Sequence, residues 1–129
     1  MNNYNISALI LRGVQYQFTK PEKKDISITV NDSIKIVGIL NNEATLDITR
    51  ELCFGPNTNS FVRINYEVVV AQNEPVAKQE LVDALVQRNT NLAMVYSKIS
   101  LLISQITNMS PFGVIVTPPS YDPRRADIQ

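Results

Sequence analysis

The hydrophobic pattern of the chain changes its period once, close to Asn73-Glu74-Pro75. Over residues 5–71 apolar side chains alternate with polar ones, the pattern of strands with one buried face. Over residues 75–108 they recur at steps of three and four, the pattern of a helix. Strands and helix are thus grouped in separate blocks, which predicts an α+β fold. The length of 129 residues suits one domain over residues 1–129.

Short polar breaks at residues 20–24, 41–42 and 55–60 separate four alternating segments. No break is long enough for a crossover helix, so the sequence predicts a four-stranded antiparallel meander in which each strand pairs with the next. In the third segment Ala44, Leu46 and Ile48 share one face, and Arg50 is the exception on that apolar face. A second layer has to cover the apolar face of such a sheet.

The first alternating segment places its even-numbered apolar residues on one face, Val14, Tyr16 and Phe18 among them. Leu9 and Leu11 fall on the opposite face, and Arg12-Gly13 is a candidate position for a β-bulge. The second segment pauses at Asn31-Asp32-Ser33 after Ile26, Ile28 and Val30.

The helical segment has an apolar surface too wide for contact with one sheet alone. Two rows run side by side: the seven-residue ladder Leu85, Leu92, Ile99 and Ile106, and the row Val82, Val86, Ala93, Tyr96 and Ile103. An unbroken helix would be about 48 Å long, whereas the radius of gyration of such a domain is about 14 Å. The helix must therefore break, with residues 89–91 the best candidate, or project into a partner subunit.

Self-association is the favoured interpretation, with Leu85, Leu92, Ile99 and Ile106 as the predicted oligomer interface. We expect a dimer or a tetramer. The alternative is a helix buried within its own subunit.

After the helix, Pro118-Pro119 excludes both a helix and a central strand over residues 111–122. We expect this segment to be extended and to lie on the protein surface, with Val114, Val116 and Tyr121 as its anchors. Residues 122–129 read as a mobile polar tail.

The residue inventory offers little to an enzyme. The chain has no histidine, the commonest general base and metal ligand, and its single cysteine has no imidazole to activate it. We therefore predict no catalytic residues, no metal and no cofactor. Twelve basic and twelve acidic residues cancel, which does not favour nucleic-acid binding. No segment has the length of a membrane span or the pattern of a signal peptide, so we expect a cytoplasmic protein.

The order of the segments resembles the SecB export-chaperone family, in which an antiparallel sheet precedes a long helix and an extended, proline-bearing segment. The most specific similarity is Ile103-Ser104-Gln105-Ile106-Thr107-Asn108 followed by residues 112–121. Val14-Gln15-Tyr16-Gln17-Phe18, with Pro21 after it, is similar to the family's first strand.

This resemblance implies a dimer of dimers that binds unfolded client polypeptides without a cofactor. It also implies that Val14, Tyr16, Phe18 and Phe112 line the client surface. Family members in protein export present a carboxylate-rich sheet face to the SecA motor. Here Asp47 and Glu51 share that face with Arg63, and this mixture of charges does not favour docking to SecA. A SecB-like chaperone dedicated to another client, such as an antitoxin or a phage-encoded protein, would fit this neutral surface as well as an export chaperone does.

Three functional hypotheses follow from these patterns. The leading one is an ATP-independent holdase chaperone for non-native polypeptides. The alternative is a non-catalytic oligomeric adaptor or structural protein that binds one folded partner. A small enzyme has the least support, because it would need carboxylates from distant segments to converge in one pocket.

Overall fold

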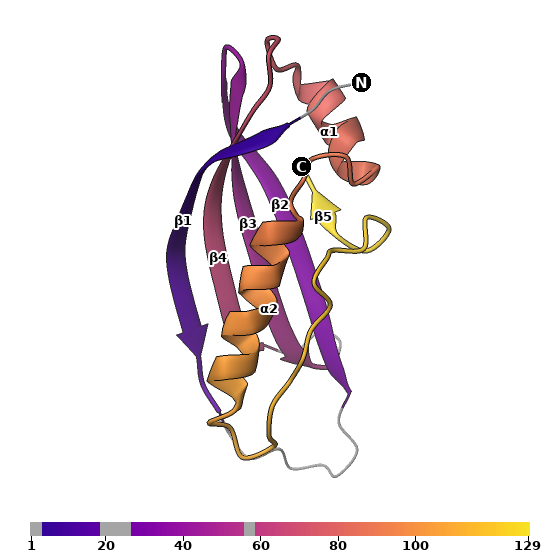
Figure 1. Cartoon of the computed structure of the whole chain (residues 1–129). Helices are drawn as coiled ribbons and strands as arrows, with labels where there is room; N and C mark the ends of the chain where they lie inside the picture. Colours follow the sequence, from indigo (N-terminus) through magenta and orange to yellow (C-terminus); the bar gives the residue numbers. More distant parts are fainter. Residues whose placement is uncertain (1–3, 19–26, 56–58) are drawn as a thin grey trace.

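A five-stranded sheet carries two helices on one face, in a computed structural model that describes residues 4–18, 27–55 and 59–129 (Figure 1). The elements, in chain order, are β1 (Asn5–Tyr16), β2 (Ile28–Leu40), β3 (Glu43–Phe54), β4 (Ser60–Ala71), α1 (Lys78–Val86), α2 (Ala93–Thr107) and β5 (Asp127–Ile128). The α+β prediction is confirmed. The predicted polar break at residues 20–24, residues 56–58 of the break predicted at 55–60, and Ile26 of the second segment lie outside the described residues.

The strand order is β1-β4-β3-β2-β5, so the predicted four-stranded meander is wrong in two respects. Strands β2, β3 and β4 are consecutive antiparallel neighbours as expected, but β1 pairs with β4 instead of β2. The connection between Tyr16 and Ile28 is longer than a hairpin turn, so nothing forces β1 and β2 to be neighbours. The predicted mobile tail instead contributes β5, which pairs in parallel with Ser33 and Ile34 of β2.

Two irregularities in β1 change which side chains face the helices. Register shifts between Ile6 and Ala8 and between Leu11 and Gly13 correspond to bulges, the second at the predicted position. Between the two bulges the register of β1 is shifted by one residue, so odd-numbered side chains replace even-numbered ones on the face toward the helices. As a result Leu9 and Leu11, and not Ala8 and Ile10, lie opposite the buried Val68 and Tyr66 of β4.

The predicted long helix is two helices. The first ends at Val86, and the second begins at Ala93. Arg88 and Asn91 between them have φ angles of 58° and 57°, the left-handed conformation that commonly ends a helix. The amides of Arg88 and Asn89 bond back to Leu85 and Ala84. The break falls where the sequence predicted it, and neither described helix is long and apolar enough to cross a membrane.

The core lies between the sheet and the two helices, where α2 crosses in front of the central strands (Figure 1). The ladder predicted as an oligomer interface, Leu85, Leu92, Ile99 and Ile106, is buried within this core. The sheet, α1 and the C-terminal segment also bury Tyr96 and Ile103 of the second row, whereas Val86 and Ala93 of that row stay exposed. Leu85, Leu92, Ile99 and Ile106 are therefore core residues of this chain, and the prediction that they form an oligomer interface is wrong.

Candidate functional site: an apolar surface beside an edge strand

β1 is an edge strand that bonds to β4 on one side, and in the described part of the chain no strand pairs with its other side. Three apolar side chains on its helix-facing side stay open to solvent: Leu11 is 44% exposed, Val14 36% and Tyr16 52%. Across the sheet they are paired with the buried Tyr66, Ile64 and Val62 of β4. The apolar face of the sheet thus continues past the helix cover.

Five aromatic residues form a cluster at the end of β1, and we call Tyr16, Phe18, Phe54, Phe61 and Phe112 the aromatic cluster. Phe54 and Phe61 stack with ring centroids 4.0 Å apart. Phe112 meets the rings of Phe18, Phe54 and Phe61 edge-on at 5.5 to 5.8 Å. Tyr16 contacts Phe18 at 5.4 Å, and this contact joins the other rings of the cluster to the exposed side of β1.

The structure brings the four predicted client-surface residues to one region. Tyr16, Phe18 and Phe112 belong to the aromatic cluster, and Val14 lies on the same strand face as Tyr16. Phe18 and Phe112 are half-buried and support the rings around them, whereas Val14 and Tyr16 are exposed. Sequence reasoning missed Leu11, because the bulge that brings it to this face changes the alternation.

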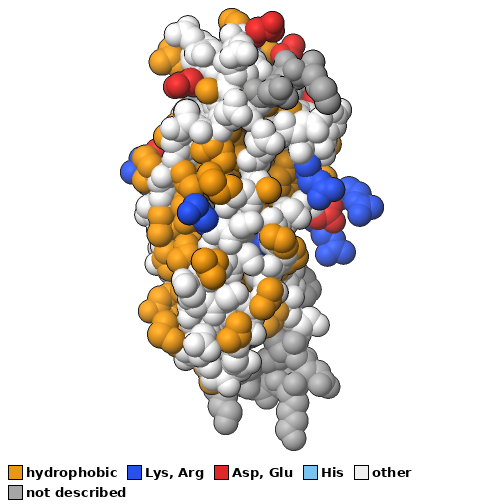
Figure 2. Space-filling model, in the orientation of Figure 1, with side chains coloured by type: hydrophobic (Ala, Val, Ile, Leu, Met, Phe, Trp, Pro, Cys, Tyr) orange, Lys and Arg blue, Asp and Glu red, His pale blue; other side chains and the backbone are white. Residues whose placement is uncertain are grey.

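The side of α2 that faces solvent adds further apolar groups. Figure 2 shows hydrophobic side chains scattered over the face of the molecule that carries α2 and the C-terminal segment. Leu101, Met109, Val114 and Val116 are all more than half exposed. Val114 and Val116 were predicted as anchors, and this is wrong for both: Ile115 and Thr117 point inward instead.

Hydroxyl groups on one side of α2 hold the C-terminal segment in place. Ser100 Oγ donates to the Thr117 carbonyl at 2.8 Å, and Ser104 Oγ to the Ile115 carbonyl at 3.3 Å. The Ile115 amide in turn donates to Thr107 Oγ1 at 2.8 Å. These hydroxyls recur once per helical turn, so the segment runs alongside the helix. Tyr121, the third predicted anchor, is buried, and its hydroxyl donates to the Leu85 carbonyl.

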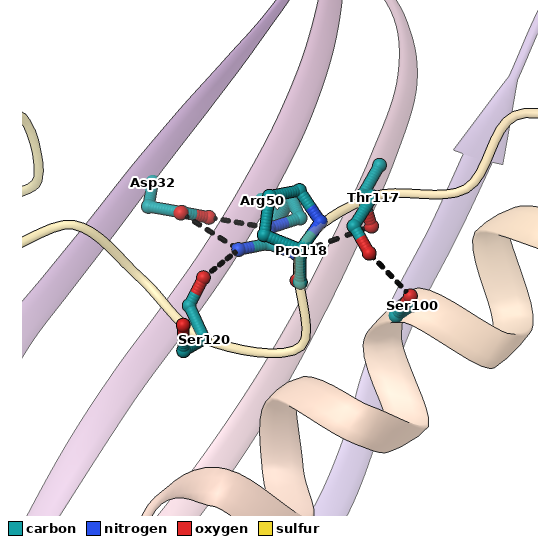
Figure 3. Close-up of polar contacts among 6 residues, drawn as sticks. All are labelled: Asp32, Arg50, Ser100, Thr117, Pro118 and Ser120. Carbon is teal, nitrogen blue, oxygen red and sulfur yellow. Dashed lines mark hydrogen bonds and ion pairs between the residues drawn. The ribbon is translucent and has the colours of Figure 1, made fainter.

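A buried arginine bonds the same segment to the sheet (Figure 3). Arg50 on β3 is fully buried, and its Nε and Nη2 bond to the two carboxylate oxygens of Asp32 at 2.7 and 2.9 Å. Its other donors reach Thr117 Oγ1 and the carbonyls of Pro118 and Ser120, and the guanidinium lies 5.1 Å from the Tyr96 ring centre. The sequence marked Arg50 as an exception without finding its partner, which lies directly opposite in the predicted polar pause.

The sheet face away from the helices carries mixed charges. Arg12 pairs with Glu67 at 2.8 Å and Arg63 with Glu51 at 3.4 Å, while Asn65 donates to the Asp47 carboxylate. Opposite charges alternate over this face, so it presents no continuous carboxylate surface.

Metal ligands and a reactive thiol are the catalytic groups that the described residues can be checked for. Within them, no three His, Cys, Asp or Glu side chains lie close enough to hold a metal ion. Cys53 is buried, and burial, with the nearby Glu51 carboxylate, raises the pKa of its thiol. A raised pKa reduces the thiolate fraction at neutral pH, which disfavours a nucleophilic role.

Comparison with solved structures places the fold. The Mycobacterium tuberculosis SecB-like chaperone Rv1957, solved in complex with a ChAD peptide from the Rv1956 HigA1 antitoxin, aligns with a TM-score of 0.62 and 11% identity over 92% of this chain and 88% of that one. A Streptococcus agalactiae protein of unknown function aligns with a TM-score of 0.44 and 9% identity, over 92% of this chain and 98% of that one. No protein-family model and no curated protein sequence matches. The alignment with Rv1957 shows that the chain has a SecB-like fold.

Proposed function

We propose that this protein is an ATP-independent holdase chaperone that binds non-native polypeptides along β1 and the adjoining aromatic cluster. The observation that carries the proposal is the outer edge of β1, which no described strand pairs with and which runs beside the exposed Leu11, Val14 and Tyr16. An extended client can bond its backbone to the strand edge and place alternate side chains on the apolar face.

The energetics suit a binder of many sequences. Apolar surface removed from water contributes about 25 cal/mol per Å² with little dependence on side-chain shape. Backbone hydrogen bonds to an edge strand are likewise independent of sequence. The combination favours exposed, extended, apolar segments, which unfolded chains offer and folded proteins hide. In this proposal the protein is not an enzyme and needs no cofactor.

The SecB-like fold supports a chaperone role, and the neighbour's antitoxin peptide suggests an antitoxin-type client for this chain as well. Service to protein export is the other candidate process. The alternating charges around Arg63 and Glu51 do not favour a SecA-type motor as partner. We further propose a cytoplasmic homo-oligomer, a dimer or a dimer of dimers. The exposed Leu101, Val114 and Val116 supply the apolar surface that such an assembly would bury.

The alternative is an oligomeric adaptor that uses the same surface for one folded partner. Such an adaptor would bind its folded partner with fixed stoichiometry and would have no general effect on the aggregation of unfolded chains. The edge of β1 favours the chaperone, because an extended segment suits it better than a folded surface does.

Light scattering by a chemically unfolded, aggregation-prone client tests the proposal. With the protein in stoichiometric excess, aggregation should be suppressed without nucleotide. An equal amount of an unrelated folded protein of similar size is the control. Aggregation as fast as in that control would refute the holdase function.

A further inference from the structure

A charged hollow of about 650 Å³ lies at the opposite edge of the sheet from β1. Its floor includes Asp32 and Arg50, and its rim carries Arg88, Asp122, Arg124 and Arg125. Figure 2 shows a group of basic side chains with one acidic group projecting from this side of the molecule. Four guanidinium groups and two carboxylates make the lining net positive in a chain whose net charge is zero.

The ion pairs of the hollow leave two guanidinium groups for a ligand. Asp32 is fully engaged by Arg50, and Asp122 lies 3.5 Å from Arg124. The side chains of Arg88 and Arg125 have no hydrogen bond or ion pair within residues 4–18, 27–55 and 59–129. Guanidinium groups bind carboxylates through two parallel hydrogen bonds, as Arg50 already does here.

A second hollow of about 380 Å³ adjoins the first, since Arg88, Ser120 and Tyr121 line both. Its walls include the buried Thr90 and Tyr96, and the Tyr96 hydroxyl makes no hydrogen bond to any described residue. The Thr90 hydroxyl lies beside that of Tyr121, which donates to the Leu85 carbonyl. A buried hydroxyl without a partner costs about 1–3 kcal/mol. A polar group of a ligand would remove that cost.

The conformation of Arg88 fits a ligand-binding role. This residue follows the C-cap of α1 with a φ of 58°, a position that glycine usually fills and asparagine tolerates. A long charged side chain in the left-handed region costs about 1–2 kcal/mol. In return for this conformational cost, the Arg88 side chain lines both hollows.

We propose that the paired hollows bind an acidic segment of a partner polypeptide. Arg88 and Arg125 bind a carboxylate of an acidic side chain in the larger hollow, and the neighbouring side chain enters the smaller one beside Thr90 and Tyr96. Two adjoining hollows suit successive side chains of one peptide. This site is separate from the apolar surface along β1 and does not depend on the holdase function.

Fluorescence anisotropy with a labelled probe peptide tests the site. The probe is a short peptide of alternating glutamate and tyrosine with both ends blocked, and the same peptide with glutamine in place of glutamate is its control. At low salt the acidic probe should bind about tenfold more tightly than the control peptide, and this preference should weaken at high salt.

The matched variants remove the same charge at two places. Arg88→Asn with Arg125→Gln should lower the affinity for the acidic probe about tenfold, and asparagine suits the left-handed conformation at position 88. The control variant Arg12→Gln with Arg63→Gln removes two guanidinium groups from the other face of the sheet and should leave the affinity within about twofold. Thermal unfolding of both variants checks that the fold is kept.

Three results would overturn the inference: equal affinity for the two peptides, equal affinity of wild type and the Arg88/Arg125 variant, or displacement of the probe by inorganic phosphate at the peptide's own concentration. The last result would assign the hollow to a small anion. A protein that fails to suppress aggregation but binds the acidic probe through Arg88 and Arg125 would refute the holdase and leave this site standing.

Discussion

Arg50 and Asp32 form a two-pronged ion pair in the interior of the subunit, with N–O distances of 2.7 and 2.9 Å. They lie directly opposite each other on β3 and β2. The remaining N–H groups of Arg50 donate to the Thr117 hydroxyl and to the carbonyls of Pro118 and Ser120. One guanidinium group therefore connects two strands and the C-terminal segment.

Asp32→Ala should lower the free energy of unfolding by about 3–5 kcal/mol, because it leaves a buried, uncompensated positive charge. Urea denaturation of the variant and the wild type measures the change.

The control for this variant is Glu67→Ala, which breaks the exposed pair with Arg12 and should cost less than about 1 kcal/mol. Replacing both members of the buried pair, as Asp32→Leu with Arg50→Met, should cost less than the sum of the single changes. Equal losses for Asp32→Ala and Glu67→Ala would contradict the buried role of the pair.

Ile99→Asp and Leu101→Asp separate the core from the outer surface of α2. Ile99 is fully buried, so an aspartate there should cost several kcal/mol (about 3 or more) and impair folding. Leu101 is 59% exposed, so an aspartate there should change the stability by less than about 1 kcal/mol.

Light scattering coupled to size exclusion should show that Leu101→Asp weakens self-association while leaving the subunit folded. A wild-type protein that elutes as a clean monomer would contradict the proposed assembly. A stable, folded Ile99→Asp would contradict the packing of α2 on the sheet.

Thr107→Val should loosen the C-terminal segment from α2. The change keeps the shape but removes the acceptor of the Ile115 amide, which costs about 1–3 kcal/mol if that amide stays buried. Hydrogen exchange at Ile115 should accelerate, while amides in the centre of β3 keep their protection. Ser97→Ala, an exposed change on the same helix, is the control. Unchanged exchange at Ile115 would show that the hydroxyl does not hold the segment.

Val14→Asp with Tyr16→Ser should abolish most of the suppression of client aggregation, because it places a charge and a small polar group on the proposed client surface. Leu40→Asp changes an exposed apolar residue beside the β2–β3 turn and is the matched control. Light-scattering traces of the three proteins with one client make the comparison. Equal loss in both variants would indicate a non-specific effect of surface charge.

Alkaline pH should destabilise the fold through its buried tyrosines. Burial above all, with the nearby Asp32 carboxylate, raises the pKa of Tyr96 above its ordinary value of 10.0. Burial also raises the pKa of Tyr121. The folded state then holds protons that the unfolded state releases, so the stability present below about pH 10 falls as the pH rises further.

The measurement is urea denaturation at several pH values, with tyrosinate absorbance followed in parallel. Tyr96→Phe should make the decline in stability less steep and should not reduce the stability at pH 7, because the hydroxyl that it removes is buried without a partner. A decline equally steep in this variant would exclude Tyr96 as its source.

Periodicity predicted the fold class, and the poor helix propensity of residues 89–91 predicted the position of the helix break, because both depend on local sequence. Local sequence could not predict that β1 pairs with β4, since the segment between Tyr16 and Ile28 permits either neighbour. The bulge in β1 was expected near Gly13, and the structure has a second bulge before Ala8. The effects of the two one-residue shifts on side-chain facing offset each other, so the alternation of apolar residues at the two ends of the strand does not reveal them.

The site was predicted in the same uneven way. Tyr16, Phe18 and Phe112 came from a family resemblance, and Phe112 meets Phe18 in one cluster although these two residues lie 94 positions apart along the chain. Arg50 was visible as a charge in an apolar register, and a buried charge needs a partner. Its partners come from β2 and from the segment after α2, and no local pattern connects these parts of the chain.

The reach of Arg50 has a consequence for synthesis on the ribosome. Its bonds to Thr117 and Ser120 join residues 67 and 70 positions apart, so β3 emerges well before the groups that complete its centre. Until Thr117 and Ser120 are synthesised, Arg50 on β3 lacks these acceptors, and the sheet lacks the C-terminal segment that helps to cover it. Completion of the core therefore waits until Thr117 and Ser120 have left the ribosome.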